Sequence, residues 1–254
     1  MDQQIQSQFG AVARNYVNSP VHAFGPDLAE LVEAIGARGD EVVLDLGTGV
    51  GHTAFAVAPR VREVVGIDLT SEMIALAREG AAERKIANVR FVRGDVSELP
   101  FPDASFDVAT SRYSAHHYHQ PERVLRELAR VLRPGGRFVL VDTISPEEPA
   151  LDTFINAVEL LRDRSHVRDY RVSEWQAMLG RAGFRAEVLK RWDLRQNFDD
   201  WIKRMQTPPV AVAMLRSLLL EAPLDVRQIF GVELEEEKLF FFLKRAMIVG
   251  QRER

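Results

Sequence analysis

Residues 42–51 read Val-Val-Leu-Asp-Leu-Gly-Thr-Gly-Val-Gly, and this stretch decides the fold. A short apolar run that contains an aspartate ends in three glycines at every second position. The run predicts a buried strand, and glycines let the backbone turn sharply and approach a ligand without Cβ interference. The spacing differs from the Gly-x-Gly-x-x-Gly pattern of dinucleotide-binding loops. The stretch therefore predicts a strand that leads into a ligand-binding loop.

Similar apolar runs recur further along the chain. Together with 42–46 they predict strands at 63–68, 89–94, 106–111 and 137–142. Helical patterns lie between them: one is capped by Thr70 or Ser71 and runs to about residue 85, and another begins at Pro121 and ends at the breaker 133–136. Strands and helices that alternate with short connections predict an α/β fold with an open, mostly parallel sheet and helices on both faces.

The two ends of the chain add elements to this sheet. Strands predicted at 184–192 and 239–249 bring the number to seven, and we expect the last one to lie antiparallel. Residues 1–37 predict two helices that form an N-terminal cap. Residues 193–231 do not fit the alternating pattern and predict a helical insertion, a possible substrate cap, with one helix around Trp201, Ile202 and Met205 and another with apolar residues Val212, Leu215 and Leu219. The length fits one domain, residues 1–254.

Three aspartates lie in or at the ends of the first three predicted strands. Asp45 stands two positions before the first glycine, where a carboxylate would repel a pyrophosphate but could face an ammonium group. Asp68 ends the second strand, where an acidic side chain can accept hydrogen bonds from both ribose hydroxyls. Asp95, followed by Val96, is placed to accept a hydrogen bond from the amine of adenine. A cap or a solvated turn would explain any one of them, but their combination indicates a nucleoside site.

These segments also resemble those of a known family in order and spacing. They are Val43-Leu44-Asp45-Leu46-Gly47-Thr48-Gly49-Val50-Gly51, Val65-Gly66-Ile67-Asp68-Leu69-Thr70, Gly94-Asp95-Val96, Leu99-Pro100-Phe101-Pro102-Asp103, Ser105-Phe106-Asp107 and Leu132-Arg133-Pro134-Gly135-Gly136-Arg137. Over about residues 40–145 the chain resembles the class I S-adenosylmethionine-dependent methyltransferases, specifically their ubiquinone/menaquinone-biosynthesis-like branch of small-molecule enzymes. The resemblance implies a Rossmann-like seven-stranded sheet with its last strand reversed, and S-adenosylmethionine as cofactor.

The resemblance assigns roles within a cofactor-binding core at 38–145. It implies that Asp45 and the glycine loop hold the methionine end, Asp68 the ribose, and Asp95 with Val96 the adenine. The full set of expected cofactor residues is Tyr16, Asp45, Gly47, Thr48, Gly49, Gly51, Asp68, Leu69, Met73, Asp95, Val96 and Ser111. Tyr16 would close over the donor, although it would equally serve to pack its helix against the sheet.

The methyl acceptor is expected beyond the fourth strand. Residues 111–119 contain three histidines, and an imidazole that titrates near neutral pH can act as a general base. We favour His116 or His117 over His119 as catalytic residues, while a purely structural role in the loop stays open for each. The cluster lacks a carboxylate at metal-ligand spacing, so we expect no metal. Arg112 either binds an acidic substrate group or pairs with a local carboxylate.

Composition narrows the possible functions. A formal net charge of −4 provides no bulk positive field for a polyanion, so we expect no nucleic-acid partner. The chain contains no cysteine, which excludes disulfides, thiolate zinc sites and cysteine nucleophiles. No window approaches the roughly 18–20 apolar residues that span a bilayer, and residues 1–9 lack a signal-peptide pattern, so we expect a cytoplasmic protein.

The leading hypothesis is methyl transfer from S-adenosylmethionine to a carbon or oxygen of a small metabolite. Apolar residues of the insertion would make that acceptor apolar or aromatic if they line its site, although they equally fit a core. A non-catalytic S-adenosylmethionine-binding module that uses the insertion for a protein partner is the alternative. A nicotinamide-dependent oxidoreductase is disfavoured by the glycine spacing and by Asp45.

Overall fold

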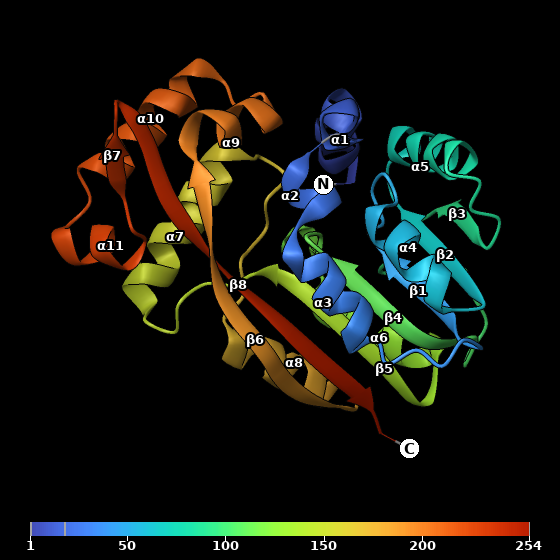
Figure 1. The fold of residues 1–254 in the computed structure, drawn as a ribbon. Helices are drawn as coiled ribbons and strands as arrows, with labels where there is room; N and C mark the ends of the chain where they lie inside the picture. Colours follow the sequence, from blue (N-terminus) through green and yellow to red (C-terminus); the bar gives the residue numbers. More distant parts are fainter. Residues whose placement is uncertain (1, 18, 254) are drawn as a thin grey trace.

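The computed structural model describes residues 2–17 and 19–253, and helices alternate with strands through most of them (Figure 1). The strands are β1 (Val42–Leu46), β2 (Glu63–Asp68), β3 (Val89–Arg93), β4 (Phe106–Arg112), β5 (Leu132–Thr143), β6 (Phe184–Asn197), β7 (Glu233–Glu235) and β8 (Lys238–Arg252). The helices are α1 (Asp2–Val17), α2 (Pro20–Phe24), α3 (Pro26–Ala34), α4 (His52–Val57), α5 (Ser71–Glu83), α6 (Pro121–Val131), α7 (Pro149–Arg162), α8 (Val172–Arg181), α9 (Phe198–Met205), α10 (Pro209–Leu220) and α11 (Leu224–Ile229), with short 3-10 helices η1 (Ala58–Arg60) and η2 (Ala115–His117).

The strands form one sheet in the order β3-β2-β1-β4-β5-β8-β6, with the short β7 paired to the start of β8. Strands β1 to β5 are parallel to their neighbours, whereas β8 runs antiparallel to both β5 and β6. The predicted mostly parallel sheet with a reversed last strand is therefore confirmed, but it has eight strands rather than seven because the short β7 was not predicted. The strand order reverses between β1 and β4, which is the point where open α/β sheets bind their ligands.

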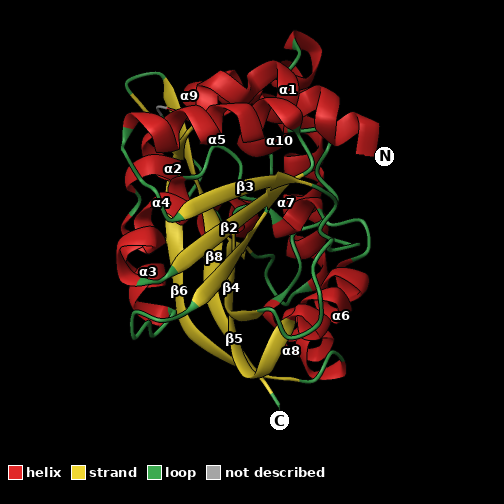
Figure 2. Ribbon diagram, turned by 90° about the vertical axis from the view of Figure 1, so that its right-hand side faces the viewer, coloured by secondary structure: helices red, strands yellow, loops and turns green. Residues whose placement is uncertain are grey.

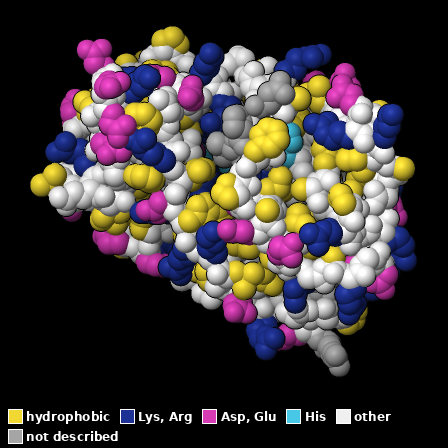
Figure 3. Space-filling view, viewed as in Figure 1, with side chains coloured by type: hydrophobic (Ala, Val, Ile, Leu, Met, Phe, Trp, Pro, Cys, Tyr) yellow, Lys and Arg dark blue, Asp and Glu magenta, His cyan; other side chains and the backbone are white. Residues whose placement is uncertain are grey.

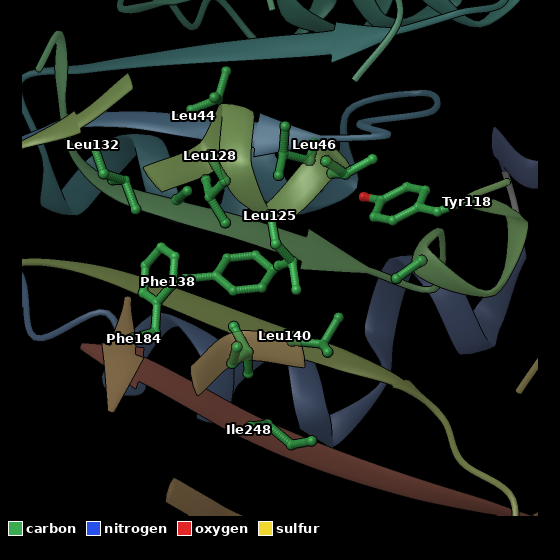
Figure 4. Close-up of a cluster of buried hydrophobic side chains, with 14 of the residues drawn as sticks. Leu44, Leu46, Tyr118, Leu125, Leu128, Leu132, Phe138, Leu140, Phe184 and Ile248 are labelled. Carbon is green, nitrogen blue, oxygen red and sulfur yellow. The ribbon is translucent and has the colours of Figure 1, made fainter. Parts of the chain in front are cut away.

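Helices cover both faces of the sheet (Figure 2). Helices α3, α4 and α5 pack on one face, and α6 and α8 on the other. Alternate residues of β1 serve the two faces: Leu44 and Leu46 join the core under α6, while Val43 joins the core under α3 to α5. Figure 4 shows Leu125 of α6 beside Phe138 of β5 in the first of these cores. Two buried layers thus hold β1 and the loop after it in place.

A second lobe stands at one end of the sheet (Figure 1). Strands β6 and β8 continue beyond the parallel strands as a ribbon, and α7, α9 and α10 pack against it. Phe241 and Leu243 of β8 meet Trp201, Leu215 and other apolar residues there. The apolar residues of the insertion were expected either to line the acceptor site or to pack in a core. Leu215 packs in a core, since it is fully buried.

Helix α1 lies between α5 and α9, so it joins the two lobes (Figure 1). Its Gln8 Nε2 donates to the Met205 carbonyl at 3.1 Å, and its Asn15 Nδ2 donates to the Arg204 carbonyl at 3.1 Å. Among the described residues, no helix is both long and apolar enough to cross a membrane.

Several element boundaries differ from the sequence-based prediction. The N-terminal segment contains three helices rather than two, because Pro20 and Pro26 each begin a new helix. The predicted insertion at 193–231 starts too early, since β6 continues to Asn197 while paired with β8. The helices α4 and α11 were not predicted.

Two turns lie beside or within strands. Glu233–Glu235 form β7, and Glu236 and Glu237, with φ of 47° and 68°, make the turn into β8. The turn at 133–136 is a bulge of β5, because Leu132 already pairs with Phe106.

Candidate active site

A cavity of about 320 Å³, the main cavity, opens at the carboxyl ends of β1, β2, β3 and β4. Its size falls in the range of roughly 300–1,000 Å³ that small-molecule sites occupy. A Cβ atom on Gly49 would meet nothing within 4 Å, so the backbone of the glycine loop faces open space. The expected cofactor residues that line this cavity are Tyr16, Gly47, Thr48, Gly49, Asp68, Leu69, Met73, Asp95 and Val96.

Asp68 fastens the glycine loop to the end of β2. Its Oδ2 accepts from the Gly49 amide at 2.9 Å, and its Oδ1 accepts from the Thr70 amide at 2.9 Å. Burial raises the pKa of Asp68, although these hydrogen bonds act in the opposite direction. These bonds orient the carboxylate at the edge of the cavity, where it can also accept from a ligand hydroxyl.

Asp95 stands at the opposite end of the same wall. Its two oxygens accept from the amide and the hydroxyl of Ser97, at 2.8 and 2.7 Å, which fixes the carboxylate beside Val96. Leu69 and Met73 add apolar side chains to the lining of the same cavity. The lining therefore combines two oriented carboxylates with apolar side chains, which suits a ribose and a planar base.

The expectation that Asp45 faces the ligand is wrong. Asp45 is 2% exposed and does not line the main cavity, because it lies inside β1 with neighbouring strands on both sides. Its oxygens accept from the hydroxyls of Thr48 at 2.6 Å and Thr110 at 2.7 Å. Burial raises the pKa of Asp45 to about 6. Asp45 thus positions Thr48 from beneath the loop.

Gly51 and Ser111 also lie behind the cavity rather than in its lining. A Cβ atom on Gly51 would come within 2.8 Å of Phe55 and 3.1 Å of Phe91, so this glycine makes room for core side chains. Ser111 Oγ lies 3.0 Å from both Ser114 Oγ and Tyr118 Oη. Ser114 and Tyr118, which were not predicted, line the cavity in its place.

A second cavity of about 50 Å³ adjoins the main cavity on the side of the helical lobe. Five side chains line both cavities and are called the aromatic partition: Phe9, Tyr16, His22, Tyr113 and His117. Their rings contact one another, with centroid distances of 4.9 Å for Phe9 with His117 and 4.9 Å for Tyr16 with His22. A molecule that crosses the partition would therefore touch mainly aromatic surface.

The two histidines that the sequence favours as catalytic residues differ in protonation state. His116 lines only the second cavity, and its Nδ1 lies 2.6 Å from Asp142 Oδ1. Burial alone would lower the pKa of His116, but Asp142 raises it to about 9. Burial and the neighbouring charge of His116 lower the pKa of His117 to about 4. At neutral pH, His116 is therefore an imidazolium and His117 a neutral imidazole.

The hydrogen bonds of His117 fix its tautomer. Its Nδ1 lies 3.0 Å from the Ser165 carbonyl oxygen, which can only accept, so Nδ1 carries the proton. The lone pair then belongs to Nε2, and Asp163 Oδ2 lies 3.9 Å from that atom. His119 also lines the main cavity, and its Nε2 has no hydrogen-bond partner among the described residues.

Arg112 pairs locally. Its Nε donates to Asp27 Oδ2 at 2.5 Å and its Nη1 donates to the His22 carbonyl at 2.8 Å. Within residues 2–17 and 19–253, no three histidine or acidic side chains are grouped closely enough to hold a metal ion.

Sequence reasoning missed the polar residues of the second cavity, among them Arg162, Arg204 and Arg245. One signal was available in β8. Buried and half-buried positions alternate along its first half, and Arg245 follows Phe241 and Leu243 at a buried position. A charged residue on the buried face of an apolar strand indicates a polar site nearby.

Comparison with known proteins agrees with this geometry. The methyltransferase domain family matches residues 44–140. The uncharacterised methyltransferase YcgJ of Bacillus subtilis is 40% identical over 247 residues, which cover 96% of this chain and 98% of that one. A demethylmenaquinone methyltransferase of Deinococcus radiodurans is 37% identical over 57% of this chain and 62% of its own length.

Two solved structures share the fold closely. The crystal structure of YcgJ superposes with a TM-score of 0.87 at 41% identity and covers 89% of this chain and 98% of that one. A Bacillus halodurans protein proposed to be a methyltransferase gives a TM-score of 0.87 at 35% identity and covers 91% of this chain and all of the other. The chain therefore belongs to the class I methyltransferases and is an enzyme that uses S-adenosylmethionine as its methyl donor.

Proposed function

We propose that the enzyme methylates an oxygen or carbon atom of a small molecule whose reacting part lies at the aromatic partition. The observation that carries this proposal is the position of His117, which lines both cavities and holds its proton on Nδ1, so that Nε2 keeps its lone pair. S-adenosylmethionine supplies a methyl group already activated on a sulfonium sulfur. The chain then has to align the acceptor and, for a hydroxyl acceptor, take up its proton.

The donor would lie along the wall of strand ends in the main cavity. Asp68 binds the ribose hydroxyls, Asp95 and Val96 bind adenine, and the loop Gly47–Gly49 receives the methionine end. Leu69 and Met73 pack against the nucleoside. The oriented carboxylate of Asp68 in the lining and the open space beside the Gly49 backbone support this assignment.

Helix α1 and the helical lobe would act as caps within a single domain, residues 1–254. Tyr16 closes over the donor from α1, and its hydroxyl lies 3.0 Å from the Met205 sulfur of α9. The hydrogen bonds from Gln8 and Asn15 to the same end of α9 support the cap, because they join the N-terminal helix to the insertion across the cavities.

His117 would accept the proton of the acceptor, with Asp163 stabilising the imidazolium that results. His116 is not the base in this proposal, because its high pKa keeps it protonated and Asp142 occupies its Nδ1. A base that must be neutral loses activity as the pH falls through its pKa. The rate should therefore be independent of His117 ionisation from about pH 5 upward.

The acceptor would be an aromatic or apolar small molecule rather than a polymer. The rings of Phe9, Tyr16 and Tyr113 supply apolar contact at the partition. On the face shown in Figure 3, Lys and Arg side chains are interspersed with Asp and Glu, unlike the continuous basic surface that binds nucleic acid.

The test is turnover of labelled S-adenosylmethionine with a panel of phenols, quinols and aromatic acids. His117→Gln should lower kcat by about 10²–10⁴-fold, the usual contribution of a general base, with unchanged affinity for S-adenosylhomocysteine. Glutamine can still donate to the Ser165 carbonyl, so the loop should stay in place. Full activity of this variant would remove His117 as the base, and tight donor binding without turnover of any small molecule would contradict the proposed acceptor class.

A further inference from the structure

The second cavity contains more guanidinium groups than carboxylates. Arg162, Arg204 and Arg245 line it, opposed by Glu159 and Asp163. Asp142, which pairs with His116, and Asp169 lie outside the lining, and both also interact with Arg245. Among the side chains that line the cavity, positive charges therefore outnumber negative ones.

Both carboxylates contact groups near their own positions. Glu159 Oε2 lies 3.8 Å from the Arg162 guanidinium, while its Oε1 has no hydrogen-bond partner among the described residues. Asp163 accepts from the amide and the hydroxyl of Ser165 at 2.8 and 2.6 Å and has His117 near its other oxygen. Neither acid is within salt-bridge distance of Arg204 or Arg245. The excess charge is thus carried by these two arginines.

Arg245 is the more buried of the two and is 8% exposed. Its Nη1 donates to Thr143 Oγ1 and its guanidinium lies 4.4 Å from the Tyr113 ring centroid, but its Nε has no hydrogen-bond partner among the described residues. A buried N–H without an acceptor is costly to a folded protein. An acceptor that enters this cavity from outside the chain would satisfy the Nε.

Arg204 projects from the last turn of α9 into the same space, and the described residues include no ion-pair partner for its guanidinium. Burial, together with Arg162 and Arg245, lowers the pKa of Arg204 to about 10, against smaller opposing effects of Tyr16 and Asp200. A bound anion would relieve this repulsion. Arginine suits the task, since its planar fork matches the oxygens of a carboxylate or phosphate.

We propose that the second cavity binds an oxyanionic group of the methyl acceptor, a carboxylate or a phosphate, through Arg204 and Arg245. The inference rests on the proposed function, because it requires the acceptor to reach across the aromatic partition toward the donor. The acceptor is then amphipathic: an apolar or aromatic body at the partition and a small negatively charged group beyond it. The charged group fixes its orientation and presents the opposite end to the methyl group.

The test is calorimetric titration of the protein saturated with S-adenosylhomocysteine, at constant ionic strength. The probes are benzoate, phenyl phosphate, the neutral analogue benzamide, and acetate as a carboxylate without a ring. At least one aromatic anion should bind about tenfold or more tightly than benzamide, which is the least expected of a charge-assisted hydrogen bond. The two aromatic anions distinguish a carboxylate from a phosphate.

Arg204→Gln should reduce the affinity of the preferred anion to that of benzamide, and Arg204→Lys should keep part of it. Arg204 is only half-buried, so these variants avoid the larger risk of unfolding at Arg245. Arg216→Gln is the matched control, because Arg216 lies on α10 and pairs with Asp199 at 3.2 Å outside the cavity. That variant should bind every probe as the wild type does.

Equal binding of benzoate, phenyl phosphate and benzamide, or no binding of any anion including acetate, would overturn the inference. A loss of affinity for S-adenosylhomocysteine itself in Arg204→Gln would also overturn it, by assigning the arginine to the carboxylate of the donor. If the wild type did not bind S-adenosylhomocysteine at all, the proposed function would fail instead.

Discussion

The two cavities are built from different kinds of sequence. The proposed donor wall of the main cavity comes from strand ends between residues 47 and 97, each only a few residues beyond a strand of the parallel sheet. The second cavity combines α1, the end of β4, α7, α9 and the ribbon of β6 and β8. A parallel sheet brings its carboxyl ends together whatever surrounds it, whereas a site on added elements depends on how those elements pack. The proposed donor site is therefore a property of the sheet, and the proposed acceptor site a property of the additions to it.

The largest expected effect concerns the loop itself. Gly47 has a φ of 62°, and a Cβ atom there would lie 2.5 Å from the Ser114 side chain. Gly47→Ala should destabilise the fold by about 3 kcal/mol or more, because left-handed strain adds to steric overlap in a packed site. Urea unfolding measures the loss.

Gly180→Ala in α8 is the control for this variant, since no atom lies within 4 Å of its Cβ position. It should leave stability unchanged or raise it by up to about 1 kcal/mol, as expected for alanine in a helix. Equal stability of the two variants would mean that the glycine loop is not held by the sheet in the way described.

The sequence was sufficient to predict the features that follow from hydrophobic periodicity and from the positions of strand ends. It predicted the strands β1 to β5 and the positions of Asp68 and Asp95, because acidic residues at the ends of parallel strands share one edge. It did not predict that Asp45 is buried. The alternation along a strand shows which face of the sheet a side chain is on, but not which other residues pack over it. Arg204 and Arg245 could not be paired from sequence, because α9 and β8 meet only after the helical lobe has packed.

The second prediction tests the donor wall at Asp68. Asp68→Ala should weaken S-adenosylhomocysteine binding by about 1.5–3 kcal/mol, the range for hydrogen bonds to a charged group. Loss of its bonds to Gly49 and Thr70 would contribute as well. A 2′-deoxy or 3′-deoxy analogue of S-adenosylhomocysteine separates the lost ribose contact from the loosened loop. The wild type should bind this analogue less tightly than S-adenosylhomocysteine, whereas Asp68→Ala should bind the two compounds with equal affinity.

Asp103→Ala is the matched control for Asp68, as Asp103 is exposed and pairs with Arg130 at 2.9 Å outside the main cavity. It should bind the donor product normally. Full affinity in Asp68→Ala would show that the ribose is held elsewhere. The strand ends of the sheet would then not form the donor site as proposed.

The smallest expected effect tests the pair of His116 and Asp142 at the edge of the second cavity. An unfolded histidine titrates near pH 6.5, whereas the pKa of His116 is raised to about 9 in the folded protein. A raised pKa stabilises the fold below the unfolded value, and this stability is lost as the pH rises through the folded value. The free energy of unfolding should therefore fall by about 1.5–2 kcal/mol between pH 7.5 and 9.5.

His116→Asn should remove this slope, because asparagine can still donate to Asp142 but carries no charge. His52→Asn should keep it, since burial lowers the pKa of His52 and places its titration below this pH window. Parallel profiles for the wild type and His116→Asn would show that His116 does not stay protonated. His117 would then lose the charge that lowers its own pKa, and either histidine could serve as the base. If the unfolding free energy falls with pH in the wild type and in His52→Asn but not in His116→Asn, His116 is charged and His117 is neutral at the second cavity. The strand ends of the parallel sheet do not determine this difference in charge.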